Sequence, residues 1–397
     1  MWQRIHRNYI GVILYFSGVR FPFYVQRCIY AMENNPHYFS EIVYLRALAI
    51  LAVISVRVSN DFFMMNSINF LTFLYMSIET FSLFGVPLFV CISGFVLYNK
   101  YQGSFSLKVF YKKRLLSVLP QYTLFTLFAI VFGYCVYTYL GEVWIVSFTD
   151  VIKMYLQGTA FTHLWYIVLI IQLYILYPFI EKIFTKSVEN HRTSALLVFL
   201  FFVQIFYQII SVHKVVLIGD TLFLAYIFYF VLGMYVQHYY ASCKNRGFTP
   251  ENAFILFFTL VSATVLGIGR LSIEYFRNDV TPLFMYWYEV ICVIVTPLYY
   301  IMIFVVCLYF AVKMSAIIPD RITQSMQIIG NYSFGIYLVH AFIFFALAMI
   351  IFPAIGFDLN NWLYYPIIFT LVVILSLGLV YGISKLPYHE YVIGSLK

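Results

Sequence analysis

Two arginines lie eleven residues apart in the otherwise apolar stretch RALAILAVISVRVSN, residues 46–60. Eleven residues advance an α-helix by about three turns, or about 16 Å, so Arg46 and Arg57 occupy nearly the same face at two depths. A charged side chain near the centre of a membrane helix costs about 2.5–3.5 kcal/mol and usually faces protein or water at a functional site. The alternatives are that Arg46 extends to the inner headgroups, and that Arg57 extends to the outer surface or pairs with Asp61.

Three further polar side chains in apolar segments are candidates for proton transfer or for holding a substrate. His340 lies within NYSFGIYLVH, near the middle of an expected membrane helix, and His163 opens FTHLWYIVLIIQLY at the outer face. Histidine changes its protonation near neutral pH, so either residue can move a proton. The alternatives are a structural role for His340 and a place in the interfacial aromatic belt for His163. Glu289 lies near the outer end of its segment and can pair with Arg57 or with a substrate.

A basic triplet precedes another apolar segment, in FYKKRLLSVLPQY. Lys112, Lys113 and Arg114 can bind lipid headgroups or the phosphates of a nucleotide-like molecule. The segment GVPLFVCISGFVLYNK, residues 85–100, contains one proline and two glycines. These residue types predict a kink and a close contact between helices.

The composition predicts an all-α integral membrane protein. Apolar residues make up 63% of the chain and charged residues 10%, whereas soluble proteins average about 45–50% and 25%. The six cysteines are scattered without metal-ligand spacing, and the sequence predicts no metal site. No sequence motif of a soluble hydrolase, nucleotide-binding loop or zinc protease is present. Apolar runs long enough to cross a bilayer predict about ten spans, at roughly 42–62, 72–98, 115–140, 163–184, 194–212, 219–240, 251–269, 284–312, 329–351 and 363–384.

The basic residues predict that both termini are cytoplasmic. With ten spans, eighteen Lys and Arg residues fall in inner segments and four in outer loops, which is the distribution that membrane proteins show. The net charge of +8 is therefore explained by Lys and Arg residues in cytoplasmic loops, which lie near membrane lipids. No nucleic-acid partner is expected. Residues 1–40 are a basic segment that either lies on the inner leaflet or precedes a start of translation at Met32. Residues 41–397 form a single membrane domain.

Five of these segments, in this order, resemble acyltransferase family 3. They are YLRALAILAVISVR, PLFVCISGFVLY, FYKKRLLSVLPQY, HLWYI and YSFGIYLVH, and the resemblance covers residues 41–385. The family consists of integral membrane enzymes of bacteria and archaea that O-acylate surface polysaccharides, peptidoglycan and lipid-linked sugars. The resemblance implies a ten-span bundle with both termini inside, in the plasma membrane.

The chain departs from the family pattern at one position that matters for catalysis. The resemblance implies an arginine in the first span and a catalytic histidine eleven residues later. Arg46 occupies the first position, but Arg57 occupies the second. A guanidinium cannot accept a proton at ordinary pH, and loss of a general base typically costs about 10²–10⁴-fold in rate. One interpretation, which we favour at this stage, is an inactive enzyme; the other is that His340 or His163 has taken over.

The resemblance also implies the substrates. The donor is acyl-CoA, most simply acetyl-CoA, and the acceptor is a hydroxyl of a glycan or lipid-linked sugar. With these substrates, the candidate catalytic residues are Arg57, His340, His163 and Glu289, and the candidate donor-binding residues are Arg46, Lys112, Lys113, Arg114, Ser93 and Tyr122. The alternatives are a transporter or flippase of lipid-linked sugars, and a pseudoenzyme that binds acyl-CoA. The sequence lacks the paired halves with broken helices that are typical of transporters.

Overall fold

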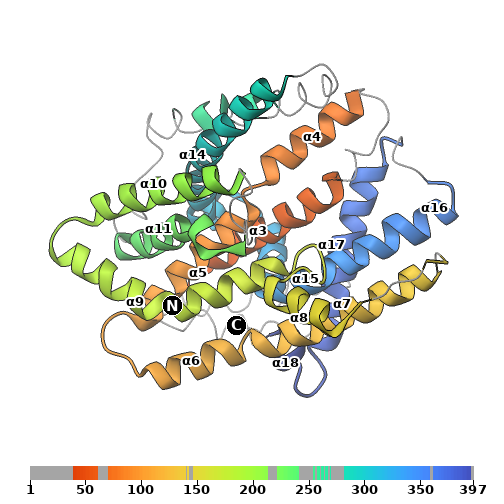
Figure 1. The fold of residues 1–397 in the computed structure, drawn as a ribbon, viewed down its shortest axis with the longest axis horizontal. Coiled ribbons are helices and arrows are strands. Elements are labelled where there is room, and N and C mark those ends of the chain that lie inside the picture. Colours follow the sequence, from red (N-terminus) through yellow and green to blue (C-terminus); the bar gives the residue numbers. More distant parts are fainter. Residues whose placement is uncertain are drawn as a thin grey trace, which may run out of the picture. The chain divides into compact units, whose positions relative to one another are not determined.

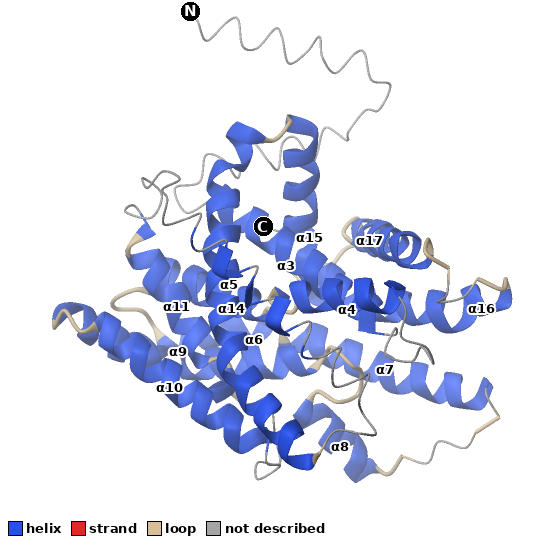
Figure 2. Ribbon diagram, turned by 90° about the horizontal axis from the view of Figure 1, so that it is seen from above, coloured by secondary structure: helices blue, strands red, loops and turns tan. Residues whose placement is uncertain are grey.

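The structure is a computed structural model, and the residues that it describes are helical, with no strand among them (Figure 2). The predictions of an interfacial helix and of a start of translation at Met32 concern residues that lie outside the described part of the chain, and both stay predictions. Glu41–Leu396 form one compact unit. The described residues are 39–60, 70–139, 141–142, 146–212, 221–240, 281–357 and 361–394, together with parts of 254–269.

Eight helical stretches of the described chain are long and apolar enough to cross a membrane. They agree with eight of the ten predicted spans. The helices, labelled as in Figure 1, are α3 (Ser40–Ser59), α4 (Phe70–Ser82), α5 (Gly85–Tyr101), α6 (Leu107–Leu116), α7 (Leu119–Tyr139), α8 (Phe148–Gln157), α9 (Trp165–Glu189), α10 (Thr193–Val212), η3 (Phe223–Ala225), α11 (Ile227–His238), α14 (Pro282–Ile317), α15 (Asp320–Phe345), the π-helical η4 (Ala346–Ile351), α16 (Phe352–Ala354), α17 (Tyr364–Ile383) and α18 (Glu390–Ile393).

The two other predicted spans are not established as membrane-crossing helices. The span expected at 219–240 contains α11, whose 12 residues extend about 18 Å and do not cover a hydrocarbon core of about 30 Å. The span expected at 251–269 lies mostly outside the described residues and includes a short apolar helix, Phe257–Leu266. The chain is therefore shown to be a multi-pass membrane protein, and the total of ten spans and the side of each terminus remain predictions.

The spans differ in how much of their surface other helices cover. The apolar window of α3 is 67% buried, whereas those of α10, α14 and α17 are 17–22% buried. Figure 1 shows α3 among α5, α15 and α17. Large apolar side chains of α10, such as Phe199, Phe202 and Phe206, are exposed, as expected for a helix that faces lipid. The first predicted span, which carries both arginines, is thus the most buried.

Two glycines bring α5 and α11 into backbone contact. A Cβ atom on Gly94 would lie 1.9 Å from the carbonyl oxygen of Phe230, and one on Gly233 would lie 1.9 Å from that of Cys91. Neither position has room for any side chain, and small residues at such crossings are typical of membrane helices. The close helix contact predicted from this segment is confirmed.

A short break interrupts this span where the kink was predicted, because α4 ends at Ser82 and α5 begins at Gly85. A Cβ atom on Gly85 would lie 2.9 Å from the carbonyl oxygen of Ala49 on α3. The break therefore lies beside α3.

Helix α3 runs parallel to α15. A Cβ atom on Gly330 would lie 2.1 Å from the carbonyl oxygen of Val43, and the guanidinium of Arg57 lies over the ring of Phe344. Arg57 follows Val43 by fourteen residues on α3, and Phe344 follows Gly330 by fourteen residues on α15. This matches the predicted alternation, in which the first and ninth spans cross the membrane in the same sense.

Candidate active site

Polar side chains from α3, α5, α9 and α15, and from the turn before α9, follow one another through the interior of the bundle. We call this set the polar column. Its members are Arg46, Ser93, Tyr166, Tyr337, His163, His340 and Arg57.

Two histidines form the centre of the polar column. His163 lies in the turn before α9 and is 6% exposed, and His340 lies on α15 and is 1% exposed. Their ring centroids are 5.1 Å apart at an interplanar angle of 65°. The hydroxyl of Tyr337 donates a hydrogen bond to the carbonyl oxygen of His163 and so attaches the turn to α15. Residues 177 positions apart in sequence are thereby brought together.

Backbone carbonyl groups fix the tautomer of each neutral imidazole. Nε2 of His163 lies 3.2 Å from the carbonyl oxygen of Leu338, and Nδ1 of His340 lies 2.7 Å from that of Tyr337. A carbonyl oxygen only accepts, so each of these nitrogens carries the proton. The lone pair then belongs to Nδ1 of His163 and to Nε2 of His340. Nδ1 of His163 is buried and has no hydrogen-bond partner among the described residues.

Arg57 lies in the last turn of α3, and its Nε atom is buried. Its guanidinium carbon lies 4.8 Å from the centre of the Phe344 ring, one helical turn after His340. Its positive charge acts on both His163 and His340. This contact with α15 does not fit the interpretation in which Arg57 extends to the outer surface. Asp61, the other partner considered, lies outside the described residues.

Tyr166 links Arg46 to the histidines. Its ring lies 5.2 Å from that of Tyr337, its hydroxyl is within hydrogen-bonding reach of Ser93, and the charge of Arg46 acts on it. Arg46 therefore faces the polar column as Arg57 does, on the face of α3 that the eleven-residue spacing predicts. Sequence reasoning did not select Tyr166, although it is the tyrosine of the motif HLWYI, three residues after His163.

The basic triplet on α6 is divided between the surface and the interior. Lys112 and Lys113 are exposed, whereas Arg114 is 9% exposed. The guanidinium carbon of Arg114 lies 4.9 Å from the ring centre of Tyr101 and 6.0 Å from that of Tyr174. Its Nε is buried and has no hydrogen-bond partner among the described residues. An arginine held between two aromatic rings in this way is suited to bind an anion such as a phosphate.

Two of the predicted site residues do not join these groups. Glu289 is exposed on α14. Tyr122 is buried, but its hydroxyl donates a hydrogen bond to the carbonyl oxygen of Tyr155, so it holds α8 against α7. Ser93 and both histidines, by contrast, contact other members of the polar column.

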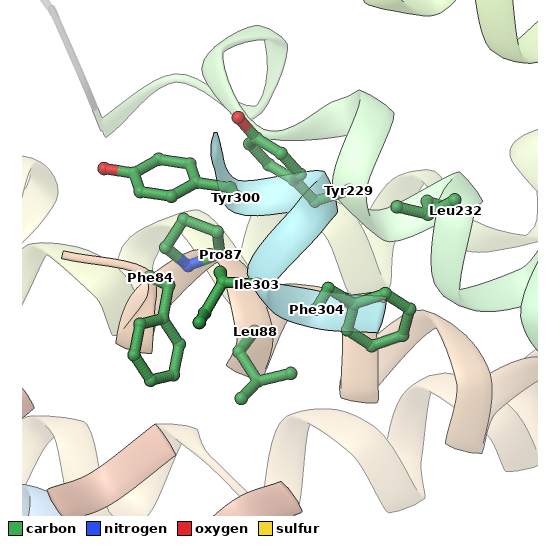
Figure 3. Close-up of a pocket in the computed structure, with 9 residues that line it drawn as sticks. Phe84, Pro87, Leu88, Tyr229, Leu232, Tyr300, Ile303 and Phe304 are labelled. Atoms are coloured by element: carbon green, nitrogen blue, oxygen red, sulfur yellow. The ribbon is translucent and has the colours of Figure 1, made fainter. Parts of the chain in front are cut away.

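A small pocket lies elsewhere, between α5, α11 and α14. Figure 3 shows mostly apolar side chains around it, with the hydroxyls of Tyr229 and Tyr300 directed to the same side. Its internal volume is about 10 Å³, which is near the minimum for one water molecule. It contains no member of the polar column and is too small for an acyl group.

The fold and the polar column define a multi-pass membrane protein with a basic and imidazole-containing site inside its helix bundle. A family model described as an acyltransferase domain matches residues 39–381, and the chain belongs to this family, acyltransferase family 3. No curated protein and no solved structure matches the chain. The family resemblance derived from the five sequence segments is confirmed. Membership of the family supports a function as a membrane acyltransferase.

Proposed function

We propose that this protein transfers an acyl group, most simply acetyl, from cytoplasmic acyl-CoA to a hydroxyl of a cell-surface or lipid-linked glycan, and that it does so in the cell membrane. The observation that carries the proposal is the polar column. It connects Arg46 to the cluster of Arg57, His163 and His340 through the interior of the bundle.

The donor is assigned to the basic groups of α6 and to the start of the polar column. Arg114 offers a desolvated guanidinium to a phosphate of CoA, and a charge-assisted bidentate contact of this kind is strong. The exposed Lys112 and Lys113 attract the polyanion from solution. Arg46 would then hold a polar part of the donor inside the bundle, next to the hydroxyl of Tyr166.

The reaction is assigned to the other end of the polar column. Arg57 can stabilise the oxyanion that forms when a hydroxyl attacks a thioester, as fixed positive groups do in other acyl-transfer sites. It cannot accept the proton, but two imidazoles with defined lone pairs lie within its electrostatic reach. We therefore propose an active enzyme in which a histidine outside the first span supplies the base. An inactive chain that still binds acyl-CoA is the alternative.

The test uses the purified full chain in lipid nanodiscs. Acetyl-CoA is added with and without a glycan extract of the cell envelope, and CoA release is followed with a thiol reagent. At 100 times its dissociation constant a ligand stabilises its protein by about 2.7 kcal/mol, so binding is also read from the melting temperature. Release that depends on the glycan supports the proposal. Thermal stabilisation without CoA release indicates the pseudoenzyme. If acetyl-CoA causes no stabilisation and no CoA is released, the result favours the transporter class.

A further inference from the structure

One ring nitrogen of His163, Nδ1, is a buried acceptor atom of the polar column. Buried polar atoms in folded proteins nearly always have a hydrogen-bond partner, so an unpartnered one needs an explanation. Nδ1 of His163 is buried without such a partner among the described residues, while Nε2 of the same ring is held by Leu338. A buried acceptor nitrogen of this kind can accept a hydrogen bond from a hydroxyl group of a bound molecule.

The position of the ring is fixed by contacts on several sides. The hydroxyl of Tyr337 holds the His163 backbone. The rings of Phe161 and Phe342 lie edge-on to the imidazole at centroid distances of 5.7 and 5.6 Å. A base that is held in place by its surroundings needs little reorganisation during the reaction.

The geometry points to His163 as the proton acceptor of this enzyme: we propose that its Nδ1 accepts the proton of the acceptor alcohol, while Arg57 holds the oxyanion. The inference deepens the proposed function and rests on it. It assigns the base to a residue outside the first span, and it makes the arginine at position 57 compatible with activity.

The step balances with the chain's own groups and two substrates. The alcohol gives its proton to Nδ1 of His163, and its oxygen forms a bond to the thioester carbonyl carbon. Arg57 stabilises the negative oxygen of the tetrahedral intermediate. The carbon–sulfur bond then breaks, the thiolate of CoA leaves, and it takes the proton back from Nδ1. The products are the ester and CoA thiol, and His163 returns to its neutral form.

His340 is the rival base. Its Nδ1 bonds to the carbonyl oxygen of Tyr337 on its own helix, and its lone pair on Nε2 makes it chemically equivalent. Two substitutions separate the two residues while keeping each structural hydrogen bond. His163→Gln places an amide donor where Nε2 reaches Leu338, and His340→Asn places one where Nδ1 reaches Tyr337.

The experiment compares glycan-dependent CoA release by these variants in nanodiscs. We expect His163→Gln to lower the turnover rate by about 10²-fold or more with unchanged affinity for acetyl-CoA, and His340→Asn to lower it by less than about tenfold. A His163→Gln turnover rate within about threefold of wild type overturns the assignment of His163 but leaves the proposed transfer intact. A loss of rate in His340→Asn that exceeds the loss in His163→Gln has the same consequence. Wild-type protein that releases no CoA overturns the inference and the proposed transfer together.

A measurement on the unsubstituted protein covers the case in which a variant does not fold. The ¹⁵N chemical shifts of the His163 ring distinguish a protonated from an unprotonated nitrogen. The ring can be assigned through the pair Thr162–His163, because Thr is followed by His only once in the sequence. We expect an unprotonated Nδ1 and a protonated Nε2 at neutral pH, and the opposite assignment overturns the inference.

Discussion

The contact between α3 and α15 at Gly330 provides the sharpest test of how the site is positioned. In Gly330→Ala the new Cβ atom would lie 2.1 Å from the carbonyl oxygen of Val43, whereas ordinary contacts begin at 3.4 Å. The two helices must therefore separate by about 1.3 Å at this point. Arg57 and Phe344 lie fourteen residues further along the same two helices, so the separation shifts the guanidinium relative to the histidines.

The magnitude follows from two general effects. Overpacking of a well-packed contact typically costs about 1–3 kcal/mol of stability. A misplacement of about 1 Å in a catalytic arrangement can cost about 10²-fold in rate. We expect Gly330→Ala to lower both the melting temperature and the turnover rate, the latter by about this factor.

The matched control is Gly378→Ala on α17, where a Cβ atom would have no neighbour within 4 Å. Both variants are measured by CoA release and by thermal unfolding in nanodiscs. The reasoning is refuted if Gly330→Ala keeps the rate and the melting temperature of Gly378→Ala, because the close approach of α3 and α15 would then have no part in placing Arg57.

Three further predictions concern the donor, the turn and the bundle. Arg114→Gln should weaken acetyl-CoA binding by at least about tenfold and Lys112→Gln by less than about threefold, as measured by titration, because only the first removes a desolvated guanidinium; equal effects would contradict this. Tyr337→Phe should lower turnover by about tenfold without changing donor affinity, since it releases the turn that carries His163; kinetics at saturating acetyl-CoA would show an unchanged rate if the bond has no such role. Gly233→Ala should lower the melting temperature, because no side chain fits against the α5 backbone, and an unchanged value would disprove that contact.

Most of the fold follows from the sequence because a bilayer constrains it strongly. Spans of about twenty apolar residues are visible individually, and glycine and proline mark the break before Gly85 and the close contacts of α5. The amphipathic helix α8 was not predicted, because its ten residues are too short to appear as a span. The expected span at 219–240 was longer than the helix found there, since apolar residues also form the short helix η3 that precedes α11.

The site was predictable in its residue types and less so in its contacts. The spacing of Arg46 and Arg57 indicates a common face, because helical periodicity is a local property. The meeting of His163 with His340 depends on how a turn packs against a distant helix, which no local pattern encodes. The separation of Arg114 from its two lysine neighbours likewise depends on the rings of Tyr101 and Tyr174, which come from other helices.

The phenylalanines around His163 have a consequence for chemical selectivity. Phe161 and Phe342 stack at 4.2 Å, and Phe128 and Phe132 pack against Phe342 at 4.9 and 5.7 Å. These rings form a hydrocarbon wall beside a group that would activate water as readily as an alcohol. In an acyltransferase, such a wall keeps wasteful hydrolysis of the activated ester slow. The preference for sugar over solvent would then be a property of the aromatic lining and not of the imidazole itself.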